Sequence, residues 1–182
     1  MVVACLTGYT SSEWLGPQLP ELKADAYLRF IVEELKPFID EMYQTEPDAD
    51  NTFIMGSSMG GLISLYAMAE YPDTFSRAAA VSIHWPLTEP DGPMAQQADA
   101  AMQSYLATSG LDPAKHTIWF DHGTETLDAA YLPHADAMET WFRNQGWSET
   151  QALFRAYPGT EHSEAAWAAR ADDILTFLLA GD

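Results

Sequence analysis

The stretch Thr52-Phe-Ile-Met-Gly-Ser-Ser-Met-Gly-Gly-Leu62 predicts a strand that turns sharply into a helix. Its first four residues are apolar, aromatic or β-branched, as in a buried strand. Small and apolar residues then predict a helix over Met59 to Glu70. Between strand and helix lies a G-x-S-x-G pattern centred on Ser58, whose two glycines let neighbouring backbone approach closely. This is the pattern of a nucleophile elbow, a strained turn that exposes a serine hydroxyl.

Ser58 is therefore the candidate nucleophile. The N–H of Met59, at the start of the predicted helix, would point to where negative charge develops on a tetrahedral intermediate, so Met59 is the predicted oxyanion-hole donor. A chance occurrence of the pentapeptide in a Gly- and Ser-rich turn is the alternative. The strand before it and the helix after it favour the catalytic interpretation, and Ser57 is interpreted as a turn residue.

A serine hydroxyl needs a base, and His162 is the candidate among five histidines. It follows the last predicted strand and precedes the last predicted helix, where a catalytic histidine lies in folds with this elbow. His84 and His122 also follow strands and are expected to line the pocket. We expect His116 and His134 to be solvated surface residues.

The third catalytic group should be a carboxylate between Ser58 and His162 in the sequence. The segment Phe120-Asp-His-Gly-Thr-Glu-Thr-Leu-Asp128 offers three. Asp128 is the preferred residue, although it could instead cap the following helix. Glu125 and Asp121 remain open, and Asp121 could bond local backbone as a turn residue.

Around the elbow, short β-rich runs alternate with long helical patterns, which predicts a single α/β domain over residues 1–182 with a mostly parallel sheet of about five strands. The predicted strands are Val2–Leu6, Thr52–Met55, Ala78–Ile83, Thr117–Phe120 and Ala152–Ala156. The predicted helices are Ala24–Tyr43, Met59–Glu70, Met94–Thr108, Asp128–Gln145 and Ser163–Leu179. Pro37 lies inside the first helical pattern and is expected to kink or divide it.

The composition argues against several classes of partner. With eight basic and 27 acidic residues the formal charge is −19, which repels nucleic acids and anionic membranes. Cys5 is the only cysteine, so the chain has neither an internal disulfide nor a cysteine-rich metal motif. We see no signal peptide and no run long enough for a membrane helix, and therefore expect a cytoplasmic protein.

Three segments also resemble a known family. GSSMGG, FDHGTETLD and PGTEHSEAAW are similar to the putative esterase family of α/β-hydrolases, which includes carboxylesterases, feruloyl and siderophore esterases and S-formylglutathione hydrolases. The resemblance implies an α/β-hydrolase fold, a small-molecule ester as substrate and no cofactor. It places the family's nucleophile on Ser58, its base on His162 and its acid on Asp128.

The chain departs from this family at its beginning. The family has a further strand and a glycine-containing loop that supplies the second oxyanion N–H, so the fold is expected to be shortened, with Thr7-Gly8-Tyr9 as a candidate substitute. A shortened sheet would leave an apolar edge. We therefore expect a homo-oligomer, most simply a dimer, whose association strengthens as salt screens the negative charge.

Hydrolysis of carboxylic esters through an acyl-enzyme on Ser58 is the leading functional prediction. Trp85, with Tyr9 and Trp14, is expected to contact an acyl or aryl group, or else to serve only in packing. A thioesterase or acyltransferase would use the same three catalytic groups. The alternative from another class is a non-catalytic or weakly active shortened hydrolase fold that binds a partner or small ligand.

Overall fold

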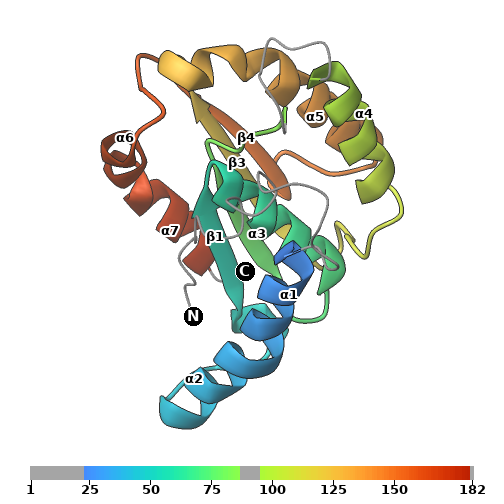
Figure 1. The fold of residues 1–182 in the computed structure, drawn as a ribbon, viewed down its shortest axis with the longest axis vertical. Helices are drawn as coiled ribbons and strands as arrows, with labels where there is room; N and C mark the ends of the chain where they lie inside the picture. The colour runs from blue at the N-terminus through green and yellow to red at the C-terminus, as the bar shows by residue number, and fades with distance from the viewer. Residues whose placement is uncertain (1–22, 87–94, 181–182) are drawn as a thin grey trace.

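The computed structural model describes residues 23–86 and 95–180, and within them four parallel strands form one sheet (Figure 1). The strands follow the chain order β1-β2-β3-β4. Their bounds are Phe53–Ser57 for β1, Arg77–Val81 for β2, Thr117–Gly123 for β3 and Ala152–Tyr157 for β4. Four of the predicted strands are thereby confirmed. The fifth, Val2–Leu6, lies outside the described residues, as does Cys5.

Helices cover both faces of the sheet (Figure 1). One face packs against Lys23–Arg29 (α1), Met59–Glu70 (α3), Ala95–Leu106 (α4) and Leu132–Asn144 (α5), which share a hydrophobic cluster with alternate strand residues such as Ile54 and Phe120. The other face carries Phe53, Ala79 and Trp119, which pack against Ala171–Leu179 (α7). Burial on both faces is what a parallel sheet requires. The chain therefore has the layered α/β architecture that its sequence predicts.

The first predicted helix is divided near Pro37, as expected. A π-helical segment, Phe30–Leu35, joins α1 to Lys36–Met42 (α2). Proline has no N–H and its ring crowds the carbonyl four residues earlier, so a regular α-turn cannot continue through it unchanged. The wider π turn, in which the Lys36 N–H donates to the Ile31 carbonyl, carries the helix past this point.

The last two predicted helices also differ in detail. The 3₁₀ segment Thr126–Ala130 precedes α5, so Asp128 lies before that helix instead of starting it. The last predicted helix is two helices, Glu164–Ala169 (α6) and α7, which meet at Arg170. No helix in the described ranges is long and apolar enough to cross a membrane. The expected dimer stays a prediction. In the described sheet β1 is an outer strand that pairs with β2.

Candidate active site

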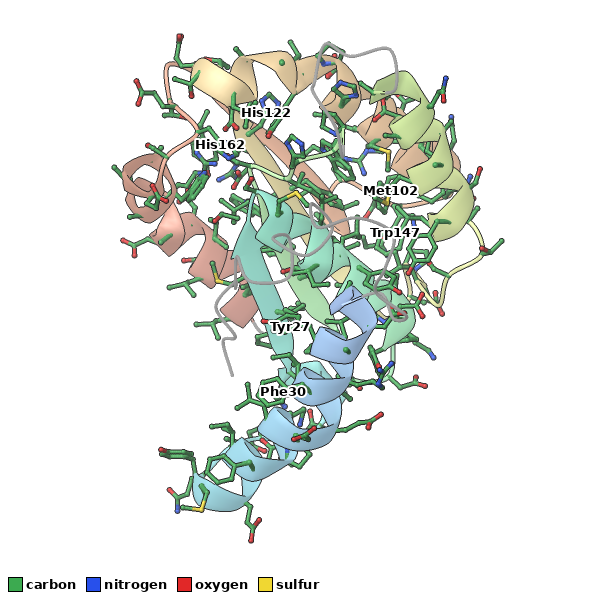
Figure 2. All side chains as sticks on the ribbon, in the orientation of Figure 1. Tyr27, Phe30, Met102, His122, Trp147 and His162 are labelled. Carbon is green, nitrogen blue, oxygen red and sulfur yellow. The ribbon has the colours of Figure 1, made fainter. Side chains whose placement is uncertain are left out.

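All three predicted catalytic residues lie beyond the carboxyl ends of strands in this parallel sheet. Ser58 follows β1, Asp128 follows β3, and His162 follows β4. Figure 2 labels His162 and, at the end of β3, His122, both at this edge of the sheet. Since parallel strands end at a common edge, residues far apart in sequence meet there. This edge is the candidate active site.

The turn at Ser58 has the strained backbone of a nucleophile elbow. Ser58 has φ 57° and ψ −118°, a conformation that L-residues rarely adopt. Its N–H donates to the Val81 carbonyl at 2.8 Å, which ties the turn to the end of β2. A Cβ at Gly56 would lie 2.5 Å from the Gly60 carbonyl oxygen, so the first glycine of the motif is sterically required. Strain of this kind costs about 1–3 kcal/mol and is concentrated at functional sites.

Asp128 and His162 form a hydrogen-bonded pair. Asp128 Oδ1 lies 2.5 Å from His162 Nδ1, with the carboxylate fully buried and the imidazole 13% exposed. Asp128 Oδ2 accepts from Ser82 Oγ and from the Gly123 N–H, each at 2.6 Å. Burial alone would raise the pKa of Asp128. The hydrogen bonds from His162, Ser82 and Gly123 outweigh it and hold this pKa below its ordinary value.

The two alternative carboxylates lie elsewhere. Glu125 is exposed to solvent. Asp121 is buried and forms an ion pair with Arg170 at 2.7 Å, while its second oxygen accepts from Trp119 Nε1. Among the described residues, Asp128 is therefore the one of the three candidates that hydrogen-bonds to His162. Which carboxylate takes part in catalysis stays a prediction.

Backbone bonds hold the His162 loop beside the Asp128 segment. The His162 N–H donates to Thr126 Oγ1 at 2.8 Å, and the N–H groups of Thr124 and Glu125 both donate to the Thr160 carbonyl. A Cβ at Gly123 would lie 2.2 Å from that carbonyl oxygen. Glycine at the end of β3 therefore lets the two segments approach closely enough for the Asp128–His162 bond.

The other four histidines differ in their surroundings. His122 lines a cavity of about 240 Å³, and His84 is half-buried, with Nδ1 2.6 Å from Tyr131 Oη. That these two line the substrate pocket stays a prediction. The prediction that His116 and His134 lie on the surface is wrong, because both are at least 95% buried. His116 accepts from the Asp112 N–H through Nδ1, so its Nε2–H donates to the Pro72 carbonyl. His134 pairs with Asp99 at 2.8 Å.

Of the residues predicted for the oxyanion hole and for substrate contact, the structure describes Met59 and Trp85. Met59 is the first residue of α3, at the positive end of that helix. Trp85 is 2% exposed, packs 5.2 Å from the Phe120 ring between ring centres, and lines the same 240 Å³ cavity as His122. Its contact with substrate stays a prediction. The candidate second donor at 7–9, together with Trp14, lies outside the described residues.

Three residues of this edge were missed by the sequence interpretation: Ser82, Trp167 and Arg170. All three hydrogen-bond to one another or to the predicted catalytic carboxylate. No spacing rule joins them, because Ser82 lies 85 and 88 residues before the other two. The one sequence feature that could have drawn attention to Ser82 is its position after Val81, where a polar residue follows a strand that is otherwise apolar. Among the described residues, no cluster of three or more His, Cys, Asp or Glu could hold a metal ion.

The lowered pKa of Asp128 predicts a pH-dependent contribution to stability. A folded-state pKa below the unfolded value of 3.8 stabilises the fold fully above that value, and the stabilisation is lost as pH falls through the folded pKa. The difference in unfolding free energy between wild type and Asp128→Asn should therefore shrink below about pH 4. Urea denaturation from pH 7 to pH 3 measures it, with the exposed Glu125→Gln as the matched variant. A difference that stays constant over this range would contradict the prediction.

The sequence and the fold both have known relatives. A family model described as Putative esterase matches residues 17–178. Ferri-bacillibactin esterase BesA of Bacillus subtilis (strain 168) is 42% identical over 64 residues, which are 34% of this chain and 22% of that protein. The uncharacterized protein YjcH of the same organism is 40% identical over 53 residues, 29% of this chain and 22% of that protein.

Solved structures share the fold at low sequence identity. A ferulic acid esterase superposes with a TM-score of 0.65 at 22% identity, over 84% of this chain and 60% of that one. The enterobactin esterase FES from Shigella flexneri gives a TM-score of 0.66 at 18% identity, over 84% and 37%. This chain therefore aligns with only part of these longer proteins, and what it shares with them at this identity is the α/β-hydrolase fold.

Proposed function

Because this chain belongs to the putative esterase family, we propose that it is a carboxylesterase-type serine hydrolase in which Ser58, Asp128 and His162 form the catalytic triad. The observation that carries the proposal is the buried Asp128–His162 pair at the sheet edge that also holds the strained Ser58 turn. A buried carboxylate that orients an imidazole beside an elbow serine is the arrangement acyl transfer needs.

The proposed reaction proceeds in two halves. The Ser58 oxygen attacks the acyl carbon while its proton passes to His162 Nε2, since Nδ1 is engaged by Asp128. The N–H of Met59 stabilises the oxyanion, and the intermediate collapses as His162 gives its proton to the leaving alcohol oxygen. Water then attacks the acyl-enzyme, gives a proton to His162, and releases the acid as Ser58 regains its hydrogen.

The proposed substrate is a small carboxylic ester with an apolar or aromatic group. Leu127 and Leu132 are 39% and 50% exposed, and they flank the segment that carries Asp128 and Tyr131. Apolar side chains exposed beside a candidate site favour an apolar ligand group. One similar structure is named as a ferulic acid esterase, and another, an enterobactin esterase, was solved in the presence of 2,3-di-hydroxy-N-benzoyl-glycine, which fits an aromatic acid in this role.

The purified protein should hydrolyse short-chain p-nitrophenyl esters without added metal, because every proposed catalytic group belongs to the protein. Release of p-nitrophenol is followed by its yellow colour in the presence and absence of EDTA, and the rate should be the same in both. A parallel assay with the matching thioester separates esterase from thioesterase preference. Turnover that EDTA removes and Zn²⁺ restores would contradict the proposed mechanism.

A further inference from the structure

Ser82 lies directly after β2, between the strand that leads to Ser58 and the strand that leads to Asp128. It is fully buried and has a positive φ of 41°, which L-residues other than Asn and Asp seldom adopt. Its N–H donates to Asp121 Oδ1 at 2.8 Å. Local conformational preference does not explain a serine at this position. Its backbone is strained, its N–H is held by a buried carboxylate, and it lies at the edge of the candidate site.

The Ser82 hydroxyl has three partners, and their chemistry fixes the direction of its hydrogen bonds. Arg170 Nη2 lies 2.7 Å from Ser82 Oγ and Trp167 Nε1 lies 3.0 Å from it. Both nitrogens can only donate, so they occupy the two lone pairs of the hydroxyl. Its single proton must then point to Asp128 Oδ2, 2.6 Å away. The hydroxyl is thus saturated and turned toward the carboxylate that binds His162.

Arg170 is held in turn by a buried ion pair. Its Nη2 reaches both Ser82 Oγ and Asp121 Oδ1, with side-chain exposures of 3% for Arg170 and zero for Asp121. Nε and Nη1 of this arginine are buried and have no hydrogen-bond partner in the described part of the chain, although its guanidinium lies 4.8 Å from the Tyr157 ring centre. Burying an incompletely bonded cation is costly, so this arrangement does not serve stability best.

Trp167 links the same hydroxyl to the base. While its Nε1 donates to Ser82, its ring packs edge-on against the His162 imidazole, with 5.0 Å between ring centres and an interplanar angle of 87°. Trp167 and Arg170 come from α6 and from its junction with α7, the segment that follows His162. The Ser82 hydroxyl therefore connects Asp128, the Trp167 ring that packs against His162, and the buried Arg170–Asp121 ion pair.

We propose that Ser82 is a positioning residue of the catalytic triad, held by Arg170 and Trp167 so that its hydroxyl orients Asp128 toward His162. The inference rests on the proposed function of that site. Without this hydroxyl, Asp128 Oδ2 keeps the Gly123 N–H as its remaining partner, and the carboxylate gains freedom to rotate away from the imidazole.

Ser82→Ala should lower kcat for a p-nitrophenyl ester on the order of 10- to 100-fold with little change in KM. Effects of this size follow when a metal-ligating side chain loses the hydrogen-bond partner that orients it. A purely structural serine would lower the amount of active protein without lowering kcat per active site.

Two variants control for folding. Ser76→Ala removes a buried hydroxyl that has no partner in the described residues at the opposite end of β2, and it should retain wild-type kcat. Ser82→Gly removes the same hydroxyl as Ser82→Ala but accepts the positive φ without strain. If Ser82→Ala fails to fold, Ser82→Gly decides: the same loss of kcat supports the proposal, and a wild-type kcat overturns it.

A readout independent of turnover separates this inference from the proposed function. The ¹H resonance of the His162 Nδ1 proton is measured by NMR in wild type and in Ser82→Gly. The resonance should shift or broaden when the hydroxyl is removed, because the Asp128 carboxylate is then less firmly oriented. Such a change in a protein without esterase activity would refute the function and uphold the positioning role. Unchanged spectra would overturn the positioning role even in an active esterase.

Discussion

Ser58→Ala should lower the hydrolysis of p-nitrophenyl esters by about a million-fold, to the background rate. In a serine hydrolase, removing the nucleophile abolishes the acyl-enzyme route, and what remains comes from binding and the oxyanion donor alone. The substitution should have little effect on the fold, because the Ser58 side chain does not cap α3 and the backbone bonds of Ser58 to Val81 and Gly61 need no hydroxyl. Initial rates at saturating ester, with protein mass checked, measure the effect.

Ser57→Ala is the matched control, since it removes the neighbouring hydroxyl at the end of β1. It should keep most of the activity. A fluorophosphonate probe, which reacts with activated serines, should add its mass to wild type and to Ser57→Ala but not to Ser58→Ala. Undiminished turnover in Ser58→Ala, or labelling that follows Ser57 instead, would refute the nucleophile. Absence of labelling in wild type would favour the non-catalytic alternative.

The elbow could be predicted from sequence because its determinants are local. The strand, the two glycines and the start of the helix occupy eleven consecutive residues, and α3 begins and ends where its pattern indicates, at Met59 and Glu70. The pairing of Asp128 with His162 could be predicted only as an order along the chain. Residues 34 apart meet because β3 and β4 are parallel neighbours, which end at one edge.

The environment of the acid could not be predicted in this way. Arg170 looks like a surface residue of a helix that continues, yet it ends α6 and turns its guanidinium inward to Asp121. His116 and His134 were misassigned for the same reason, since their partners Pro72 and Asp99 lie 44 and 35 residues away. Propensity and periodicity describe neighbours along the chain, whereas buried polar groups are satisfied by neighbours in space.

Asp128→Asn should lower kcat by about 10⁴-fold, because an amide at this position presents an N–H to the imidazole and favours the tautomer that cannot accept the serine proton. The geometry makes the effect specific. Asp128 Oδ2 already accepts from Ser82 and Gly123, so the amide oxygen is drawn to that side and the NH₂ group is left facing His162 Nδ1. Steady-state rates between pH 6 and pH 9 measure the loss.

Two carboxylate variants decide whether Asp128 is the acid. Glu125→Gln changes an exposed side chain and should stay within about twofold of wild type, which is the small effect expected of a surface substitution. Asp121→Asn breaks the buried pair with Arg170, so its main effect should be a lower midpoint of thermal unfolding. Circular dichroism of Asp128→Asn must show a folded protein for its rate to count. If that folded protein keeps wild-type activity while Glu125→Gln loses it, the acid is Glu125, and the Asp128–His162 bond then only holds the loop after β4 in place.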